Sequence, residues 1–276
     1  MNRTVCSIVL VMVMVMVVVM NMTASGQGRT GQPWQVVTAG HATIYYTNMD
    51  ASIVGPVSSM LNAGEGKVAE FFGGPFDSAF AVYIYPDRKS LDKQWQQAWG
   101  DTSFHSECWM VASGVADRLD LVSPRIWATE HCEHNFGDSA ASSALLAHEL
   151  VHVYQGQHNP RKQFDGLDSL AWYLEGLATY ASGQLDEKRM KGVKALLDAG
   201  KGPDKLGTFW TGQAKYGNAG SLVAYIDKKY GRKMLFDLLP QTDQRVMLHL
   251  LGTTEEYLIQ GWRKSLPSVF RMPIHR

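Results

Sequence analysis

The sequence predicts an α+β fold, with strands concentrated in the first half of the chain and helices in the second. Short apolar or alternating runs, typical of strands, occur mainly before residue 123. The later residues instead place apolar side chains at helical spacing, and the longest such segments follow residue 138. At 276 residues the chain can hold one large domain or two small ones around a substantial core.

The first 26 residues are expected to be an export signal. Arg3 precedes an unbroken apolar run from Ile8 to Met20, and Thr23 to Gly26 supplies small residues typical of a cleavage site. The run is short for a bilayer span, which favours cleavage over an uncleaved anchor. We therefore expect residues 1–26 to be removed and residues 27–276 to form a secreted or periplasmic domain without a stable membrane span.

Charge and cysteine content limit the possible partners and compartment. Lys plus Arg and Asp plus Glu both number 26, so the chain lacks the excess of basic residues that would favour a nucleic-acid partner. Beyond the signal, the cysteines are Cys108 and Cys132, and an exported protein would oxidise them to a disulfide. Free thiols or a second metal site remain alternatives, because possible ligands lie nearby: His105, Glu107, His131, Glu133 and His134.

Four strands are predicted in the first half. Trp34 to Thr38 and Ala42 to Tyr46 read as a hairpin, and the wholly apolar run Ala79 to Tyr85 reads as a central strand. Leu119 to Val122 is a brief strand that suits a sheet edge beside a cleft, where an extended peptide could pair with it. An ordinary edge strand explains this last segment equally well.

Two helices are predicted between these strands, at Asp50 to Phe72 and Ser90 to Trp99. The first contains Gly64-Glu65-Gly66, which has the composition of a nucleotide-binding loop. No strand precedes this triplet and the helical pattern continues through it, so we reject that interpretation.

The second half is predicted to be helical. A long helix can begin at a cap, Asp138 or Ser139, and end at Gly156. Further helices are predicted at Asp168 to Ser182, Leu185 to Ala199, Gln213 to Tyr230 and Lys233 to Leu239. We expect a sheet lobe over about residues 33–157 and a helical lobe over about residues 158–276.

The long helix carries His-Glu-Leu-Val-His at residues 148–152. Positions i and i+4 share a helix face, so His148 and His152 can direct both imidazoles at one point. Burying these groups with Glu149 is costly unless a metal ion or another partner satisfies them. Two neutral imidazoles and one carboxylate leave a tetrahedral zinc ion an open position for water, and Glu149 is placed to take a proton from that water.

Glu175 is the best candidate for the third ligand. It lies on a separate predicted helix among apolar neighbours, where a buried carboxylate needs a cation or a partner. Gly176 is expected to let the two helices approach closely enough for both to reach one zinc ion.

His148-Glu149-x-x-His152, followed by Trp-Tyr-Leu-Glu-Gly-Leu-Ala-Thr-Tyr at residues 172–180, resembles the gluzincin zinc metallopeptidases and most closely their small peptidase MA-like domains. The resemblance covers about Leu119 to Leu239. It implies His148, His152 and Glu175 as zinc ligands and Glu149 as general base. It also implies a mixed sheet lobe packed on the active-site helix, a helical lobe, and a peptide or protein substrate in the groove between them.

Tyr216 matches a tyrosine often found in this group near the start of a helix, and its hydroxyl could stabilise the oxyanion of the attacked carbonyl. It also shares a helical face with Val223, Ile226 and Tyr230, so a purely structural role in the core fits the pattern equally well.

Two departures from the related peptidases stand out. Residues 113–117, Ser-Gly-Val-Ala-Asp, do not reproduce the Gly-x-Met-Glu-Asn element of the aminopeptidases, so recognition of a free N-terminus is unsupported. Thr179 stands where thermolysin-like members carry an aspartate that orients a histidine. Asp168 is our candidate to replace that aspartate.

The sequence therefore predicts a secreted metallopeptidase with one zinc ion that hydrolyses peptide bonds. One alternative is a non-catalytic zinc domain that binds a peptide or a cell-envelope partner. Glu149 argues against it, because a structural zinc site needs no base and usually closes with a fourth protein ligand. The other alternative is a zinc hydrolase of a non-peptide amide, which would use the same metal chemistry.

Overall fold

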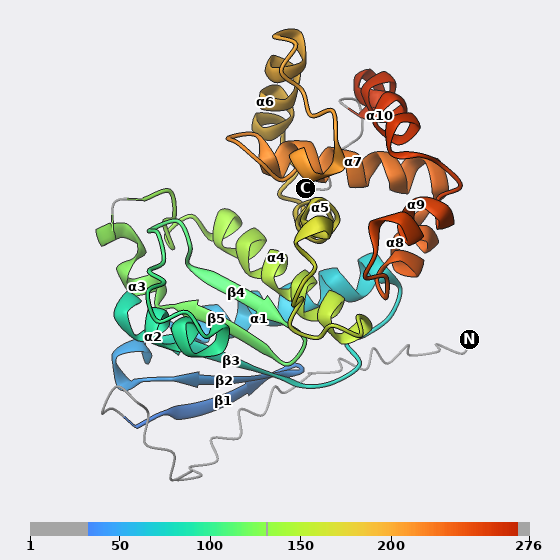
Figure 1. Ribbon diagram of the computed structural model, residues 1–276. Helices are drawn as coiled ribbons and strands as arrows, with labels where there is room; N and C mark the ends of the chain where they lie inside the picture. The colour runs from blue at the N-terminus through green and yellow to red at the C-terminus, as the bar shows by residue number, and fades with distance from the viewer. Residues whose placement is uncertain (1–32, 131, 270–276) are drawn as a thin grey trace, which may run out of the picture.

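The computed structural model describes residues 33–130 and 132–269, so the expected export signal lies outside the described residues. Strands form one sheet in the first half, and the second half is helical, as predicted (Figure 1). We call the sheet with helices α1 to α4 the sheet lobe and helices α5 to α10 the helical lobe. The α+β prediction is confirmed.

The sheet is mixed and has the strand order β1-β2-β3-β5-β4. Its strands are β1 (Gln35–Ala39), β2 (Ala42–Tyr46), β3 (Phe80–Tyr85), β4 (Ala112–Val115) and β5 (Arg118–Val122). The two outer pairs are antiparallel, whereas β3 pairs in parallel with both β2 and β5. The predicted edge strand, β5, is therefore internal. The edge strand next to β5 is β4, which was not predicted from the sequence.

Helices α1 (Val54–Phe72) and α4 (Ser139–His158) pack against each other, and α4 packs closely on β4. The sheet residues on the covered face, including Ile44, Val82 and Leu119, are fully buried. Gly64 and Gly66 lie inside α1, which confirms that this triplet is not a nucleotide-binding loop. Helix α2 (Arg88–Trp99) lies against β3 and β5, and α3 (Pro124–Trp127) follows β5.

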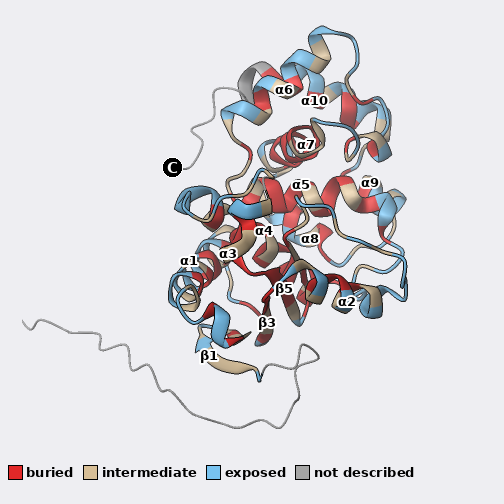
Figure 2. Ribbon diagram, turned by 90° about the vertical axis from the view of Figure 1, so that its left-hand side faces the viewer, coloured by how far each residue is buried: buried red, intermediate tan, exposed pale blue. Residues whose placement is uncertain are grey.

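Helix α7 (Lys215–Tyr230) is the centre of the helical lobe. It packs against four neighbours: α5 (Ala171–Ala181), α6 (Glu187–Asp198), α8 (Arg232–Leu238) and α10 (Glu255–Val269). In Figure 2, α4, α5 and α7 are coloured largely as buried residues. Helices α9 (Gln244–Leu250) and α10 were not predicted from the sequence. Short 3₁₀ turns lie at Asn48–Asp50, Ala128–Glu130, Asp168–Leu170 and Leu206–Thr208.

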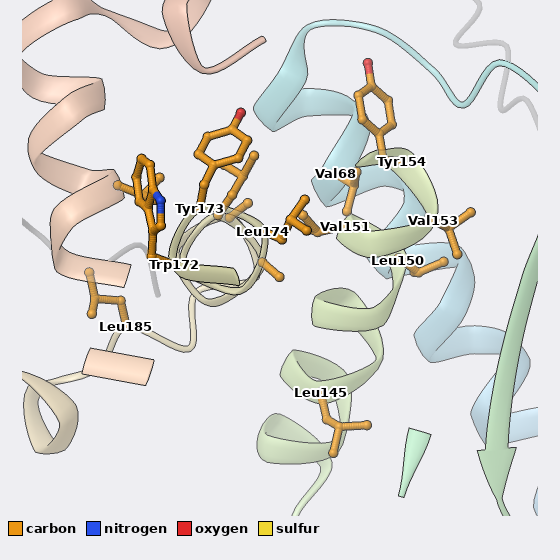
Figure 3. Packing of buried hydrophobic residues seen from close by; sticks show 14 of the residues in the cluster. Val68, Leu145, Leu150, Val151, Val153, Tyr154, Trp172, Tyr173, Leu174 and Leu185 are labelled. Carbon is orange, nitrogen blue, oxygen red and sulfur yellow. The ribbon is translucent and has the colours of Figure 1, made fainter. Parts of the chain in front are cut away.

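Helix α4 begins at the predicted cap, where the Asp138 carboxylate accepts a hydrogen bond from the Ala141 amide. It does not end at Gly156 as predicted but continues to His158. A Cβ at Gly156 would lie 2.5 Å from the Ala116 backbone nitrogen, so this glycine permits the close approach of the chain after β4. In Figure 3, Val151 of α4 lies between Leu174 of α5 and Val68 of α1, in the core between the lobes.

Cys108 and Cys132 form a disulfide with a Cα–Cα distance of 5.8 Å, as the sequence analysis expected. The bond joins the segment before β4 to the segment before α4. Among the helices in the described part of the chain, none has the length and apolar character needed to cross a membrane.

Candidate metal centre

Three candidate ligands from two helices meet at one point between the lobes. His148 and His152 lie on α4, and their Nε2 atoms are 3.2 Å apart. The Oε2 atom of Glu175, on α5, lies 3.3 Å from His148 Nε2 and 3.6 Å from His152 Nε2. The two histidine side chains are 7% and 10% exposed and the glutamate side chain is 28% exposed, so the site is open toward solvent at the carboxylate.

These separations fit a tetrahedral zinc ion. Zinc–nitrogen and zinc–oxygen bonds of about 2.0–2.2 Å place neighbouring ligand atoms about 3.3–3.6 Å apart in a tetrahedron. The three measured distances lie close to that range. Imidazole and carboxylate groups are also the ligands found in catalytic zinc sites.

Gln155 fixes the orientation of His152. The Nδ1–H of His152 donates to Gln155 Oε1 at 2.8 Å, so in the neutral imidazole the lone pair lies on Nε2, which faces the other two ligands. The Gln155 amide then donates to the Leu174 carbonyl at 3.0 Å, directly before Glu175. Gln155 therefore connects the imidazole of one helix to the backbone of the other.

Gln155 was not predicted from the sequence, where Asp168 was the candidate for this role. Asp168 is exposed in the 3₁₀ turn before α5, so that expectation is wrong. Thr179 does not replace it, because its buried hydroxyl has no hydrogen-bond partner among the described residues. The sequence feature that could have indicated this role is the glutamine three positions after His152, within the predicted helix.

The electrostatics favour positive charge at the centre of the site. Burial opposes the charged form of His152, but the adjacent Glu175 carboxylate outweighs it and raises the pKa of His152 to about 9. Burial likewise opposes ionisation of Glu175, but the two imidazoles lower the pKa of its carboxyl well below the usual range. Even without a metal ion, the ligands are arranged to hold a cation.

Glu149 and Tyr216 lie beside this point in the wall of a cleft of about 1530 Å³. Glu149 is half-buried, and His148 lines the same cleft. The Tyr216 ring centre is 6.2 Å from that of His148. Burial, together with the nearby carboxylates of Glu175 and Glu149, raises the pKa of Tyr216, so its hydroxyl stays protonated and able to donate.

Val223 and Ile226, which share a face with Tyr216 in the sequence pattern, are fully buried in the core. Tyr216 itself is only half-buried, because it occupies the first turn of α7 where the helix reaches the cleft. The Tyr216 side chain therefore lies beside the candidate ligands, at the N-terminal end of the α7 face that packs in the core.

Two glycines bring the surrounding elements together. A Cβ at Gly114 of β4 would lie 2.3 Å from the Glu149 carbonyl oxygen, so the edge strand runs directly along the helix that carries the ligands. A Cβ at Gly176 would lie 2.6 Å from the Ala219 carbonyl oxygen of α7. Gly176 therefore permits the approach of α7 rather than of α4, which corrects the role expected from the sequence.

The cleft has walls from both lobes. Residues 111–113, at and before the start of β4, line one side, and residues 211–214, before α7, line the other. An extended chain could pair with the free edge of β4, the possibility that the sequence analysis had assigned to β5.

No protein-family model matches the chain, and no curated protein matches it. Among solved structures, the chain is similar to an M1 zinc metallopeptidase from Deinococcus radiodurans, with 16% sequence identity and a TM-score of 0.44. The match covers 85% of this chain and 49% of that one. A mutant of a two-domain M1 zinc metallopeptidase bound to L-arginine has 15% identity and a TM-score of 0.42, with coverage of 88% and 53%. The chain spans about half the length of these structures.

Proposed function

We propose that this protein is an exported zinc metallopeptidase in which His148, His152 and Glu175 hold one zinc ion and Glu149 is the general base. The observation that carries the proposal is the convergence of two imidazole nitrogens and one carboxylate oxygen at 3.2 to 3.6 Å. That spacing suits a tetrahedral ion with three protein ligands. The Cys108–Cys132 disulfide supports export, since such bonds persist in oxidising compartments.

A zinc ion bound here would polarise the carbonyl of the scissile bond and acidify a water molecule. Glu149, in the same cleft wall, accepts the proton of the attacking water and then delivers it to the leaving amine. The Tyr216 hydroxyl donates a hydrogen bond to the oxygen that gains negative charge. Gln155 holds the His152 imidazole in the tautomer that presents Nε2 to the site.

The position of Glu149 favours catalysis over a purely structural zinc site. Its side chain lines an open cleft together with His148, and no fourth Cys, His, Asp or Glu joins the candidate cluster within the described residues. A structural zinc site usually has four protein ligands and needs no base. The size of the cleft and the exposed edge of β4 fit an extended peptide better than a small non-peptide amide.

Digestion of a broad peptide library tests the proposal. The zinc-loaded protein should cleave peptides, and a chelator should stop cleavage. Replacing Glu149→Gln should lower the rate by about 100-fold or more while zinc content stays at one ion per chain, because the residue acts on the proton and not on the metal. Retained turnover in this variant would refute the general-base assignment, and the absence of any chelator-sensitive cleavage by the natural protein would refute the enzyme.

A further inference from the structure

A lysine of the helical lobe contacts aromatic rings of both lobes. The Lys215 Nζ lies 4.5 Å from the centre of the Trp109 ring and 4.7 Å from that of Trp210. The Tyr216 ring centre is 5.3 Å away. An ammonium at these distances is attracted to the ring faces. Because Trp109 precedes β4 and Lys215 begins α7, this contact joins the sheet lobe to the helical lobe.

The contact joins two segments that line the cleft containing the candidate metal centre. Trp109 lines one wall and is followed there by residues 110–113. The opposite wall contains residues 211–214 and Tyr216, on either side of Lys215 in sequence. Lys215 therefore links the two walls beside the position where a substrate would meet Tyr216.

Trp109 lies on the segment of residues 107–110 before β4, which we call the arm, and the arm is held in place by several contacts. The Arg88 guanidinium donates to backbone carbonyls of the arm at 2.8 to 3.0 Å, namely those of Glu107, Cys108 and Met110. The disulfide ties Cys108 to Cys132. His134 Nε2–H donates to the Trp109 carbonyl at 3.0 Å. With the arm held in this way, separating Lys215 from Trp109 requires movement of the helical lobe or of the lysine side chain.

We propose that Lys215 and Trp109 form a strap across the cleft that restricts the site to short or unfolded peptide chains. The inference rests on the function proposed above. An extended strand occupies about 5 Å in the plane of a sheet and can pass along β4 with the walls joined. A helix is about 10 Å across, and a folded segment of that width requires the walls to separate.

Replacing Lys215→Met tests the strap, because methionine keeps the unbranched chain and removes the charge. The substrates are a short peptide chosen from the library digestion and the same sequence placed within a surface helix of a folded carrier protein. We expect kcat/KM on the folded carrier to rise about fivefold or more, and kcat/KM on the short peptide to stay unchanged. Lys215→Arg keeps a cation for the rings and should resemble the natural protein.

Lys229→Met is the matched control. Lys229 lies on the same helix, but the two rings that its Nζ faces, Tyr225 and Tyr230, belong to α7 itself and not to the sheet lobe. This variant should leave the ratio of the two kcat/KM values unchanged. If Lys215→Met changes both substrates equally or changes neither, the strap is refuted.

A labelling experiment tests the strap independently of activity. Ser113→Cys places a thiol in the cleft wall on β4, and the variant is made with and without Lys215→Met. The thiol should react equally fast with a small maleimide in both proteins, whereas a maleimide carrying a bulky polymer should react about fivefold faster after Lys215→Met. Equal rates with the bulky reagent would overturn the strap even if peptide hydrolysis is observed. Absence of hydrolysis with the expected labelling would instead reject the proposed function alone.

Discussion

Gln155 connects the two helices that carry the candidate zinc ligands. Its amide oxygen accepts from His152 and its amide nitrogen donates to the Leu174 carbonyl, next to Glu175. A group that orients a metal-binding histidine commonly affects metal affinity almost as much as the ligands themselves. The side chain acts here on both the imidazole of α4 and the backbone of α5.

Replacing Gln155→Ala should weaken zinc binding by about 10- to 100-fold, because the His152 tautomer and the position of α5 are no longer fixed. Competition with a chelator of known affinity measures this change. Gln163→Ala is the control, since Gln163 is exposed and its amide donates to the Asp117 carboxylate and not to a candidate ligand. Equal affinity in both variants would show that Gln155 does not support the site.

Tyr216→Phe tests the second proposed catalytic group. Loss of the hydroxyl should lower kcat by about 100-fold with zinc content unchanged, because the donor acts on the oxygen that gains charge during the reaction. Steady-state kinetics and elemental analysis are to be measured on the same preparation. An unaltered kcat would return Tyr216 to a packing role in the cleft wall.

At the residue scale, His148, His152 and Glu149 were predictable because polar and ionisable side chains are costly to bury without a cation or another partner. Glu175 was predictable for the same reason, as a carboxylate within an apolar helix. Gln155 was not, because an amide can be satisfied by many backbone groups and its partner, the Leu174 carbonyl, is defined only when two helices meet. Asp168 was the candidate for orienting a histidine, but it is exposed.

At the scale of elements, the contact between β4 and α4 sets the distance from the sheet edge to the ligands. Gly114→Ala would place a Cβ 2.3 Å from the Glu149 carbonyl oxygen, a position that the strand can avoid only by moving away from α4. We expect the free energy of unfolding to fall by about 1–3 kcal/mol, as measured by urea denaturation. Gly66→Ala, on the exposed side of α1 with no heavy atom within 4 Å of the new Cβ, should instead stabilise by about 0.5–1 kcal/mol. Equal effects of the two substitutions would contradict the close packing of β4 on α4.

The same close approach explains which elements the sequence could indicate. β3 was predicted because its run is apolar throughout, and α4 because a cap residue precedes apolar side chains at helical spacing. β4 reads Ala-Ser-Gly-Val, a short run whose small residues reflect the nearby helix rather than strand propensity. Gly156 was taken as a helix end for a related reason, because a glycine that admits a neighbouring chain has the same sequence signal as a helix cap.

For the whole molecule, the Cys108–Cys132 disulfide joins two segments of the sheet lobe that are 24 residues apart in sequence. Closing a loop of that length restricts the unfolded chain, and we expect a stabilisation of about 3 kcal/mol. The double variant Cys108→Ser with Cys132→Ser should show this loss in urea denaturation monitored by circular dichroism. Reduction of the natural protein should reproduce it, and an unchanged denaturation midpoint under both treatments would contradict the expectation.

The cleft itself could be anticipated only in outline. A sheet lobe and a helical lobe with a groove between them followed from the resemblance, but the groove walls come from segments far apart in the chain, such as residues 109–113 and 211–214. Loops of this kind carry little periodicity, so their contacts depend on how the lobes pack.

The central claim is that His148, His152 and Glu175 bind one zinc ion and leave a position open for water. X-ray absorption spectroscopy of the zinc-loaded protein, with elemental analysis of the natural chain and of Glu175→Ala and Glu149→Gln, tests it most directly. The account predicts one zinc per chain, two imidazole ligands with oxygen ligands at about 2.0–2.2 Å, loss of zinc in Glu175→Ala and retention in Glu149→Gln. Unchanged zinc content in Glu175→Ala, or a sulfur or third imidazole ligand, would contradict it.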